Sequence, residues 1–292
     1  MVLEHRAARN GKLGSFLRWE LGLSSTLVNR LKRQDAMFVN GRAVHSDYPV
    51  AFGDIVSVRI EEPQPEYPAQ PGKLCILFED EALIAIDKPA GMMVHPSRSR
   101  NTDTLANYLA YYYQTTGQKC AVHPVSRLDR DTFGVVLLAK NAHIHARLCQ
   151  CHTRGTIEKT YHAAVYGAPP QTQGRITLPI ARLSPQGMLR GVREDGQSAC
   201  TDYCTLEETP PCTLLELHPR TGRTHQLRVH LAAVGCPILG DPQYGSSASQ
   251  AFSLRCGYQY QQLCAVQLRF PHPLTDELVT ITSGQRITLP SV

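Results

Sequence analysis

The stretch His123-Pro-Val-Ser-Arg-Leu-Asp-Arg-Asp-Thr-Phe-Gly134 places two carboxylates among arginines, directly before the apolar run 134–139. That run has the length of a buried strand. In an extended loop, Asp129 and Asp131 would share one side and the arginines the other. An aspartate beside a cation is held ionised and can act as a nucleophile or a base. Taken alone, such a charge-alternating segment is usually a solvated turn. Other parts of the sequence must therefore distinguish a catalytic loop from a solvated turn.

A second polar segment, Leu217-His-Pro-Arg-Thr-Gly-Arg-Thr-His-Gln-Leu-Arg-Val-His-Leu231, leads into an expected helix over 224–234. Arg220 and Arg223 lie in the loop before the helix N-terminus. Free backbone N–H groups and the helix dipole favour an anion there, so the pattern predicts a phosphate seat. Arg228 lies next to the apolar face of the helix, where it can point inward at a carboxylate. Arginines that merely pair with surface acids are an equal alternative on spacing alone.

Strand-like runs outnumber helical ones in the remainder of the chain and do not alternate strictly with them. The expected strands are 74–78, 82–86, 134–139, 161–166, 213–217 and 263–270, and the expected helices are 103–113, 141–151 and 224–234. Thr102 is the expected cap of the first of these helices. The order predicts an α+β fold with a mixed, mainly antiparallel sheet rather than a doubly wound one.

Residues 1–60 carry most of the net positive charge: they have nine Lys or Arg against five Asp or Glu, and the whole chain of 292 residues has a net charge of +5. Apolar spacing predicts two short helices there, the first stopped by Gly22 and the second capped by Ser24. Asn40-Gly41 predicts a hairpin, and a last strand follows at 55–60. A basic module in front of a near-neutral body is typical of a phosphate-binding appendage.

This order resembles the RNA-binding module named after small-subunit ribosomal protein four, over residues 12–60. The alternative is a small α+β cap with a solvated, charged helix. The resemblance implies that RNA is bound through four cations: Arg30, Lys32, Arg33 and Arg42. Four prolines and no periodicity mark the next stretch as a linker. The predicted organisation is an RNA-binding module over 1–60, a linker over 61–73 and a catalytic domain over 74–292.

Composition and cysteine usage bound the class of protein. With 42% apolar and 19% charged residues, the chain is neither disordered nor collagen-like nor a coiled coil. Ten cysteines at irregular spacings, in a chain too long to need disulfide staples, predict reduced thiols and a cytoplasmic location. The first 14 residues carry charges where a signal peptide needs an apolar stretch, and no apolar run approaches the roughly 20 residues of a membrane span.

Both polar segments closely resemble motifs of the RluA-type family of RNA pseudouridine synthases. The matching motifs are R-L-D-R-D-T-x-G before an apolar strand, H-P-x-T-G-R-T-H-Q-L-R-V-H-L, and G-D-P-Q-Y-G at 240–245. Supporting matches lie at 87–96, 158–161, 195–201 and 270–273. In the expected order, they cover about 74–282, which is nearly the whole second domain.

The resemblance implies roles for particular residues. Asp129 would be the catalytic aspartate, attacking the ribose or the base, or removing a ribose proton, so that the glycosidic bond breaks. Tyr161 would stack on uracil and help to remove the proton from the carbon that joins the sugar. Arg228 would pair with Asp129, although spacing leaves Arg223 open for this part. Arg127 would fill the gap left by the everted nucleotide.

The other expected substrate-binding residues are Arg130, Arg220, Arg223, His225 and Gln226. The expected partner is ribosomal or transfer RNA, the default state is a monomer, and no cofactor is implied because the product is an isomer of the substrate. Chemistry on a base needs the nucleotide taken out of its stack, and a planar guanidinium can occupy the vacated place. For Tyr161, the alternative is ordinary core packing of a strand aromatic.

Two departures from the family pattern concern the loop before the strand. Ser126 stands where the family often has His, and Phe133 stands where it usually has Ser. Neither position carries the implied reaction, so we expect changes in loop packing and substrate choice only.

Parts of the sequence also suggest three other functions. A zinc site is suggested by His143, His145, Cys149, Cys151 and His152, but no C-x-x-C pair is present and the segment fits an amphipathic helix, so no metal site is predicted. A phosphate-ester hydrolase using Asp129 and Asp131 would lack a metal-binding carboxylate set and a Gly-rich phosphate loop. A non-catalytic RNA-binding or ribosome-assembly factor on the same fold remains the main alternative.

Overall fold

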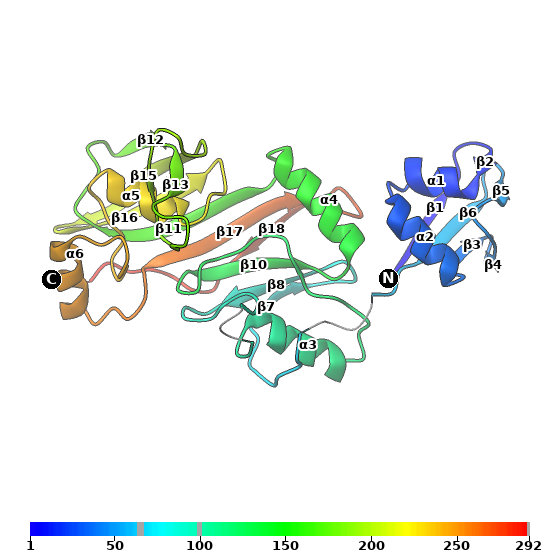
Figure 1. Ribbon diagram of the computed structural model, residues 1–292, viewed down its shortest axis with the longest axis horizontal. Coiled ribbons are helices and arrows are strands. Elements are labelled where there is room, and N and C mark those ends of the chain that lie inside the picture. Colours follow the sequence, from blue (N-terminus) through cyan, green and yellow to red (C-terminus); the bar gives the residue numbers. More distant parts are fainter. Residues whose placement is uncertain (63–66, 98–100, 291–292) are drawn as a thin grey trace.

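The computed structural model describes residues 1–62, 67–97 and 101–290, which form a small N-terminal module beside a larger domain (Figure 1). The module's sheet has the order β1-β6-β3-β4 and is antiparallel throughout. Its strands are β1 (Val2–Arg6), β3 (Met37–Val39), β4 (Arg42–Ala43) and β6 (Ile55–Arg59); β2 (Gly11–Lys12) pairs separately with β5 (Pro49–Val50). Helices α1 (Leu13–Trp19) and α2 (Ser25–Arg33) complete the module.

Local sequence signals account for the module. Asn40 and Gly41 both have positive φ, 50° and 77°, which a tight hairpin between β3 and β4 requires. The Ser24 hydroxyl accepts the N–H of Leu27, so the predicted cap of α2 is confirmed. The apolar faces of both helices bury Leu17 and Leu31 in one core with the strands. The sequence pattern missed β1, whose residues are mostly exposed and therefore show no alternation.

The larger domain is built on a ten-stranded sheet. Its order is β12-β15-β16-β11-β17-β10-β8-β7, with β18 paired to β17 and β9 to β10. The strands are β7 (Ile76–Glu79), β8 (Leu83–Lys88), β9 (His123–Pro124), β10 (Phe133–Ala139), β11 (Glu158–Tyr166), β12 (Gln173–Thr177), β15 (Cys200–Thr209), β16 (Cys212–Pro219), β17 (Leu263–Pro271) and β18 (Leu278–Thr282). Among the strands that the structure describes, only β10 and β17 pair in parallel, so the predicted mixed, mainly antiparallel α+β fold is confirmed.

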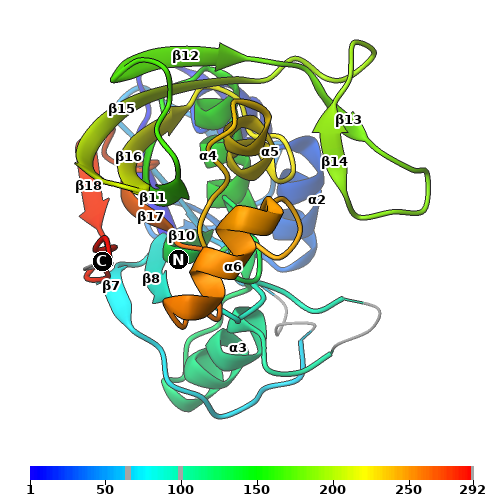
Figure 2. The ribbon, with the colours of Figure 1, turned by 90° about the vertical axis from the view of Figure 1, so that its left-hand side faces the viewer.

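Four helices and a separate hairpin complete the described part of the larger domain. They are α3 (Leu105–Thr115), α4 (Ala142–Thr153), α5 (Gln226–Ala233), α6 (Ser247–Arg255), and the hairpin of β13 (Ile180–Arg182) and β14 (Arg190–Val192). In Figure 2 the hairpin projects from the body of the domain close to α5. The sequence pattern identified α3, α4 and α5 but not α6 or the hairpin.

The predicted cap of α3 is wrong by two residues. Asp103 adopts a left-handed conformation with φ 58°, so the chain is not helical there. Thr104 caps the helix instead, because its hydroxyl accepts the N–H of Asn107 while the Asn107 side chain accepts the N–H of Thr104.

The described part of the predicted linker is attached to the rest of the chain. Glu62 pairs with Arg30 of α2 at 2.9 Å and also accepts the N–H of Ala142 at the start of α4. Gln70 and Asp103 exchange two hydrogen bonds. Residues 63–66 lie outside the described residues.

Two further observations concern the whole chain. All ten cysteines have free thiols. Within 1–62, 67–97 and 101–290, every helix is too short or too polar to cross a lipid bilayer.

Candidate active site

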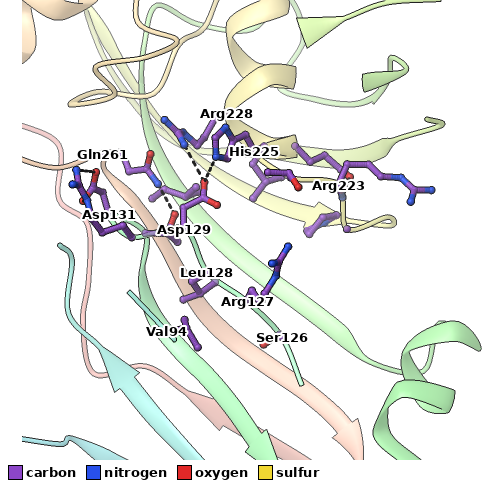
Figure 3. A pocket seen from close by; sticks show the side chains of 18 of the residues that line it. Val94, Ser126, Arg127, Leu128, Asp129, Asp131, Arg223, His225, Arg228 and Gln261 are labelled. Carbon is purple, nitrogen blue, oxygen red and sulfur yellow. Dashed lines mark hydrogen bonds and ion pairs between the residues drawn. The ribbon is translucent and has the colours of Figure 1, made fainter. Parts of the chain in front are cut away.

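The two polar segments of the sequence meet at one pocket of about 720 Å³ (Figure 3). Residues 125–132 line it from the loop between β9 and β10, and residues 221–228 line it from the start of α5. The β13–β14 hairpin contributes Met188 to the rim. The pocket therefore joins segments that are about 100 positions apart in the chain.

The loop that carries Asp129 turns rather than runs extended. The N–H of Thr132 donates to the carbonyl of Asp129 at 3.2 Å, which closes a turn around Arg130 and Asp131. Arg130 and Asp131 then pair with each other through two hydrogen bonds of 2.7 and 2.8 Å. The prediction that Asp129 and Asp131 share one side of an extended loop is wrong, because the turn sends the two carboxylates to different partners (Figure 3).

Lys88, at the end of β8, ties this loop to the sheet. Its buried ammonium donates to the carbonyls of Pro89, Met92 and Arg130 at 2.8 to 2.9 Å. Burial lowers the pKa of Lys88 to about 7, against the attraction of the nearby carboxylates of Asp131 and Asp129. Sequence reasoning quoted the motif around Lys88 and assigned it no role.

The position after the charged loop, Gly134, has a backbone conformation and surroundings that require glycine. Its φ is +104°, and a Cβ at this position would lie 2.3 Å from the carbonyl oxygen of Ala265. This is where β10 and β17 pair in parallel, so only glycine allows the two backbones to approach. The neighbouring Phe133 is buried in a core cluster with Leu239 and Phe252, which accounts for a large apolar residue at that position.

Arg228 is the centre of the charged network. Its Nη1 donates to Oδ2 of Asp129 at 3.1 Å, while Nε and Nη2 donate to the two carboxylate oxygens of Asp241 at 2.7 and 2.9 Å. Nη2 also donates to Gln243, and the guanidinium lies 4.8 Å from the ring centroid of Tyr244. Burial acts to lower the pKa of Arg228, but its hydrogen bonds and charge interactions with Asp241 and Asp129 raise the pKa above its usual value.

Spacing had left open whether Arg228 or Arg223 pairs with Asp129. The structure pairs Arg228, whereas Nε of Arg223 donates to the carbonyl of Ser198 at 3.0 Å and its side chain extends away from Asp129 (Figure 3). Sequence reasoning missed Asp241 as a site residue. The available signal was its place in the motif G-D-P-Q-Y-G.

Tyr161 of β11 forms part of the pocket wall. Burial raises the pKa of its hydroxyl well above the usual range, and the negative charge of Asp129 adds to this effect. The phenol therefore keeps its proton at neutral pH.

His225 and Gln226 stand next to each other but have different surroundings. Nε2 of His225 lies 3.9 Å from Oδ2 of Asp129. The Gln226 amide oxygen accepts from Thr221 and from the N–H of Arg223, and its amide nitrogen donates to the carbonyl of Cys200 and the hydroxyl of Thr201. Gln226 therefore holds the shape of the loop before α5, and His225 reaches toward the carboxylate.

The remaining predicted arginines occupy the edge of the site. Arg127 is exposed and lines the pocket beside Ser126. Arg220 pairs with Asp202 at 2.7 Å, and Asp202 also binds Arg175. The predicted phosphate seat at the start of α5 thus has Arg220 and Arg223 nearby, both exposed and both already bound to groups of the chain.

The four cations predicted for the N-terminal module differ in their surroundings. Lys32, Arg33 and Arg42 are exposed, whereas Arg30 is half-buried in its ion pair with Glu62. The side chains of the first three therefore face solvent.

The histidines and cysteines of α4 are spread over different neighbours. Sγ of Cys149 lies 3.6 Å from Nε2 of His145, while His152 faces Lys159 at 3.1 Å. In the described ranges, no three His, Cys, Asp or Glu side chains are grouped as a metal site would require.

The residues of this site lie in a region that is similar to known proteins. A profile of the family described as RNA pseudouridylate synthase matches residues 82–233, which include Asp129, Tyr161 and Arg228. A protein of Bacillus subtilis (strain 168), YhcT, described as an uncharacterized RNA pseudouridine synthase, is 36% identical over 274 residues, covering 91% of this chain and 87% of its own.

The chain belongs to the RNA pseudouridine synthase family. Ribosomal large subunit pseudouridine synthase D of Zymomonas mobilis is 37% identical over 235 residues, covering 77% of this pseudouridine synthase and 74% of its own length. Among solved structures, human RNA pseudouridylate synthase domain containing 1 matches with a TM-score of 0.61 and 26% identity, covering 74% of this chain and 86% of its own. This RNA pseudouridine synthase is accordingly an isomerase.

Proposed function

We propose that this pseudouridine synthase is of the RluA type and converts uridines of ribosomal or transfer RNA, with Asp129 as the catalytic carboxylate. The observation that carries the proposal is the 3.1 Å hydrogen bond from Arg228 to Oδ2 of Asp129, in a pocket that Tyr161 also lines. The side chain of Asp129 is 30% exposed, so a nucleotide can reach it, and the buried guanidinium of Arg228 holds one of its oxygens by a hydrogen bond.

The reaction needs only bond exchange within one nucleotide. The bond between N1 of uracil and C1′ of ribose breaks, and a bond between C5 and C1′ forms. C5 gives up its proton and N1 gains one, so atoms and electrons balance without an oxidant or reductant. Asp129 starts this exchange by attacking the ribose or the base, or by removing a ribose proton.

Arg127 and Tyr161 prepare the substrate. Uracil must leave its stack before the carboxylate can reach it, and the exposed guanidinium of Arg127 takes the vacated place in the RNA. Tyr161 stacks on the everted base from the wall of the pocket and assists removal of the C5 proton. Arg130, Arg220, Arg223 and His225 contact the surrounding nucleotides and phosphates.

The N-terminal module adds affinity for folded RNA. Its exposed cations Lys32, Arg33 and Arg42 lie on one compact unit, where several phosphate contacts can act together. Relatives from Zymomonas mobilis and Vibrio cholerae are named for the large ribosomal subunit, which makes its RNA the first place to look for the target. The protein works as a monomer in the cytoplasm.

Mapping of pseudouridine tests the proposal. Ribosomal and transfer RNA from cells with and without the gene are compared at single-nucleotide resolution, and the deleted cells are rescued with the wild type, Asp129→Asn or Asp195→Asn. We expect one or more sites to disappear on deletion and to return with the wild type and with Asp195→Asn, an exposed surface control. Full restoration by Asp129→Asn would overturn the assignment of Asp129 and favour the alternative, a non-catalytic RNA-binding factor.

A further inference from the structure

His225 has an unusual backbone at the start of α5. Its φ is 57°, in the left-handed region that residues with a Cβ seldom adopt, and its side chain is 10% exposed. This conformation directs the imidazole into the pocket, next to Asp129 and Arg228 (Figure 3). The strain is therefore located at the proposed catalytic carboxylate.

Tyr244 determines which ring nitrogen of His225 carries the proton. The hydroxyl oxygen of Tyr244 accepts the backbone N–H of Arg190 at 2.9 Å and lies 2.7 Å from Nδ1 of His225. The N–H of Arg190 can only donate, so among the described residues Nδ1 of His225 is the one acceptor within reach of the Tyr244 proton, which is therefore directed at Nδ1. The neutral imidazole then holds its hydrogen on Nε2.

The other end of the ring favours the same tautomer. Nε2 lies 3.9 Å from Oδ2 of Asp129, so a lone pair on Nε2 would face a carboxylate, whereas an N–H is attracted to it. Arg228 donates to the same oxygen at 3.1 Å. Among the residues that the structure describes, none donates to Oδ1 of Asp129.

We infer that His225 is a positioning residue for Asp129: its neutral imidazole, aligned by Tyr244, directs Nε2–H at Oδ2 and so leaves Oδ1 as the oxygen that meets the everted uridine. The inference rests on the proposed function for its consequence, but the tautomer itself is a property of the unliganded protein. Together, Arg228 and His225 set the plane of the carboxylate.

Burial is the main reason that the ring stays neutral near pH 7. Burial lowers the pKa of His225, Arg228 and Arg190 also lower it, and Asp129 and Asp241 oppose them. At a pH below this pKa, the imidazolium would bind Asp129 as an ion pair and compete with substrate for it. Activity should therefore fall on the acid side, with a midpoint below 6.5.

Nitrogen NMR of the full-length protein tests the tautomer without any RNA. The protein is labelled with ¹⁵N-histidine, and the ring signals of His225 are identified by their loss in His225→Asn, a residue that tolerates positive φ. At pH 7.5 we expect a protonated Nε2 and an unprotonated Nδ1, and a mixture of tautomers in Tyr244→Phe. A protonated Nδ1 in the wild type would overturn the inference.

Steady-state kinetics on the RNA identified by mapping is the second test of the positioning role. Tyr244→Phe should lower kcat about tenfold, with KM changed less than about twofold, because the carboxylate is misaligned while the binding surface stays intact. His225→Gln, which cannot titrate, should lose the acid limb of the pH profile. Tyr203→Phe, a half-buried tyrosine outside the pocket, is the matched control.

The outcomes separate the two proposals. A wild-type kcat in Tyr244→Phe, or an unchanged acid limb in His225→Gln, contradicts the positioning role even if pseudouridine is formed. Absence of any pseudouridine with the wild-type protein contradicts the proposed function, and the NMR result still decides the tautomer.

Discussion

At the scale of single residues, Arg228 lies between two carboxylates and binds them unequally. It makes two hydrogen bonds to Asp241, whose side chain is completely buried, and one to Asp129, whose side chain remains partly exposed. Asp241 therefore compensates most of the buried guanidinium charge. The arginine therefore orients Asp129, whose side chain stays partly exposed in the pocket.

Asp241→Ala should separate this support from the chemistry. The substitution leaves Arg228 buried with only Asp129 as a charged partner in the network, so we expect a loss of about 3 kcal/mol in the free energy of unfolding. We also expect a reduced kcat, because Arg228 would then bind Asp129 more tightly. Denaturant unfolding and single-turnover assays measure the two effects.

The matched control is Asp195→Ala, which removes the partner of Arg193 at the surface. Exposed pairs contribute about 0 to 1 kcal/mol, so this variant should unfold almost like the wild type. If both variants lost the same free energy of unfolding, the buried pair of Arg228 and Asp241 would contribute no more to stability than an exposed pair.

At the scale of elements, α4 shows both what sequence patterns detect and how a polar residue is accommodated. Asn141 caps the helix through the N–H of Ile144, as the predicted start at 141 requires. His143, Ile144 and Leu148 form its buried face. Burial, with the nearby charge of Arg147, lowers the pKa of His143 to about 4.

The buried His143 should make stability depend on pH. Between pH 6.5 and 4, the unfolded chain binds a proton on this residue that the folded chain does not bind, so stability falls as the pH falls. The slope contributed is at most about 1.4 kcal/mol per pH unit. Denaturant unfolding of wild type and His143→Gln across this range should show a shallower dependence in the variant.

Burial also lowers the pKa of other histidines, such as His123 and His230, so the comparison needs a control. His45→Gln changes an exposed histidine of the N-terminal module and should keep the wild-type slope. Parallel curves for the wild type and His143→Gln would rule out the contribution of His143.

Strands were predicted with uneven success, for one physical reason. The runs that became β8, β10, β16 and β17 are buried over most of their length and read as apolar stretches. By contrast, β12 and β15 have mostly half-buried or exposed residues, so no apolar run or clear alternation marks them. The sheet has ten strands because these polar strands pair through their backbones.

At the scale of the whole molecule, the basic module is joined to the larger domain by specific contacts. Arg30 pairs with Glu62, and Glu62 accepts the N–H that begins α4. Figure 1 shows the module beside the larger domain, with α2 facing it. Arg30 therefore links the two parts, whereas the side chains of Lys32 and Arg33 are exposed.

Neutralising the two exposed cations of α2, Lys32 and Arg33, should change the salt dependence of RNA binding. For Lys32→Gln combined with Arg33→Gln, the slope of log K against log salt should become shallower by about 1 to 2, since each phosphate contact contributes about 0.7 to 0.9. Filter binding or fluorescence anisotropy on ribosomal RNA, over a range of salt concentrations, gives the slope.

Arg9→Gln serves as the control, because Arg9 is exposed in the same module but already paired with Glu20. It should alter the slope much less than the double variant. An unchanged slope in Lys32→Gln/Arg33→Gln would remove these residues from the RNA-binding surface.

Much of this protein could be read directly from its residues, because the relevant physics is local. Caps, the Asn40-Gly41 hairpin and the apolar core strands depend on a few neighbouring positions, and the motifs around Asp129 and Arg228 are continuous in the chain. Partner choice is different, since it depends on where separate loops meet in space. Only the tertiary structure shows that Asp129 pairs with Arg228 rather than Arg223, and that Asp241 and Tyr244 belong to the same network. It also shows that Asp131 pairs with Arg130 and that Arg30 lies at the junction between the module and the larger domain.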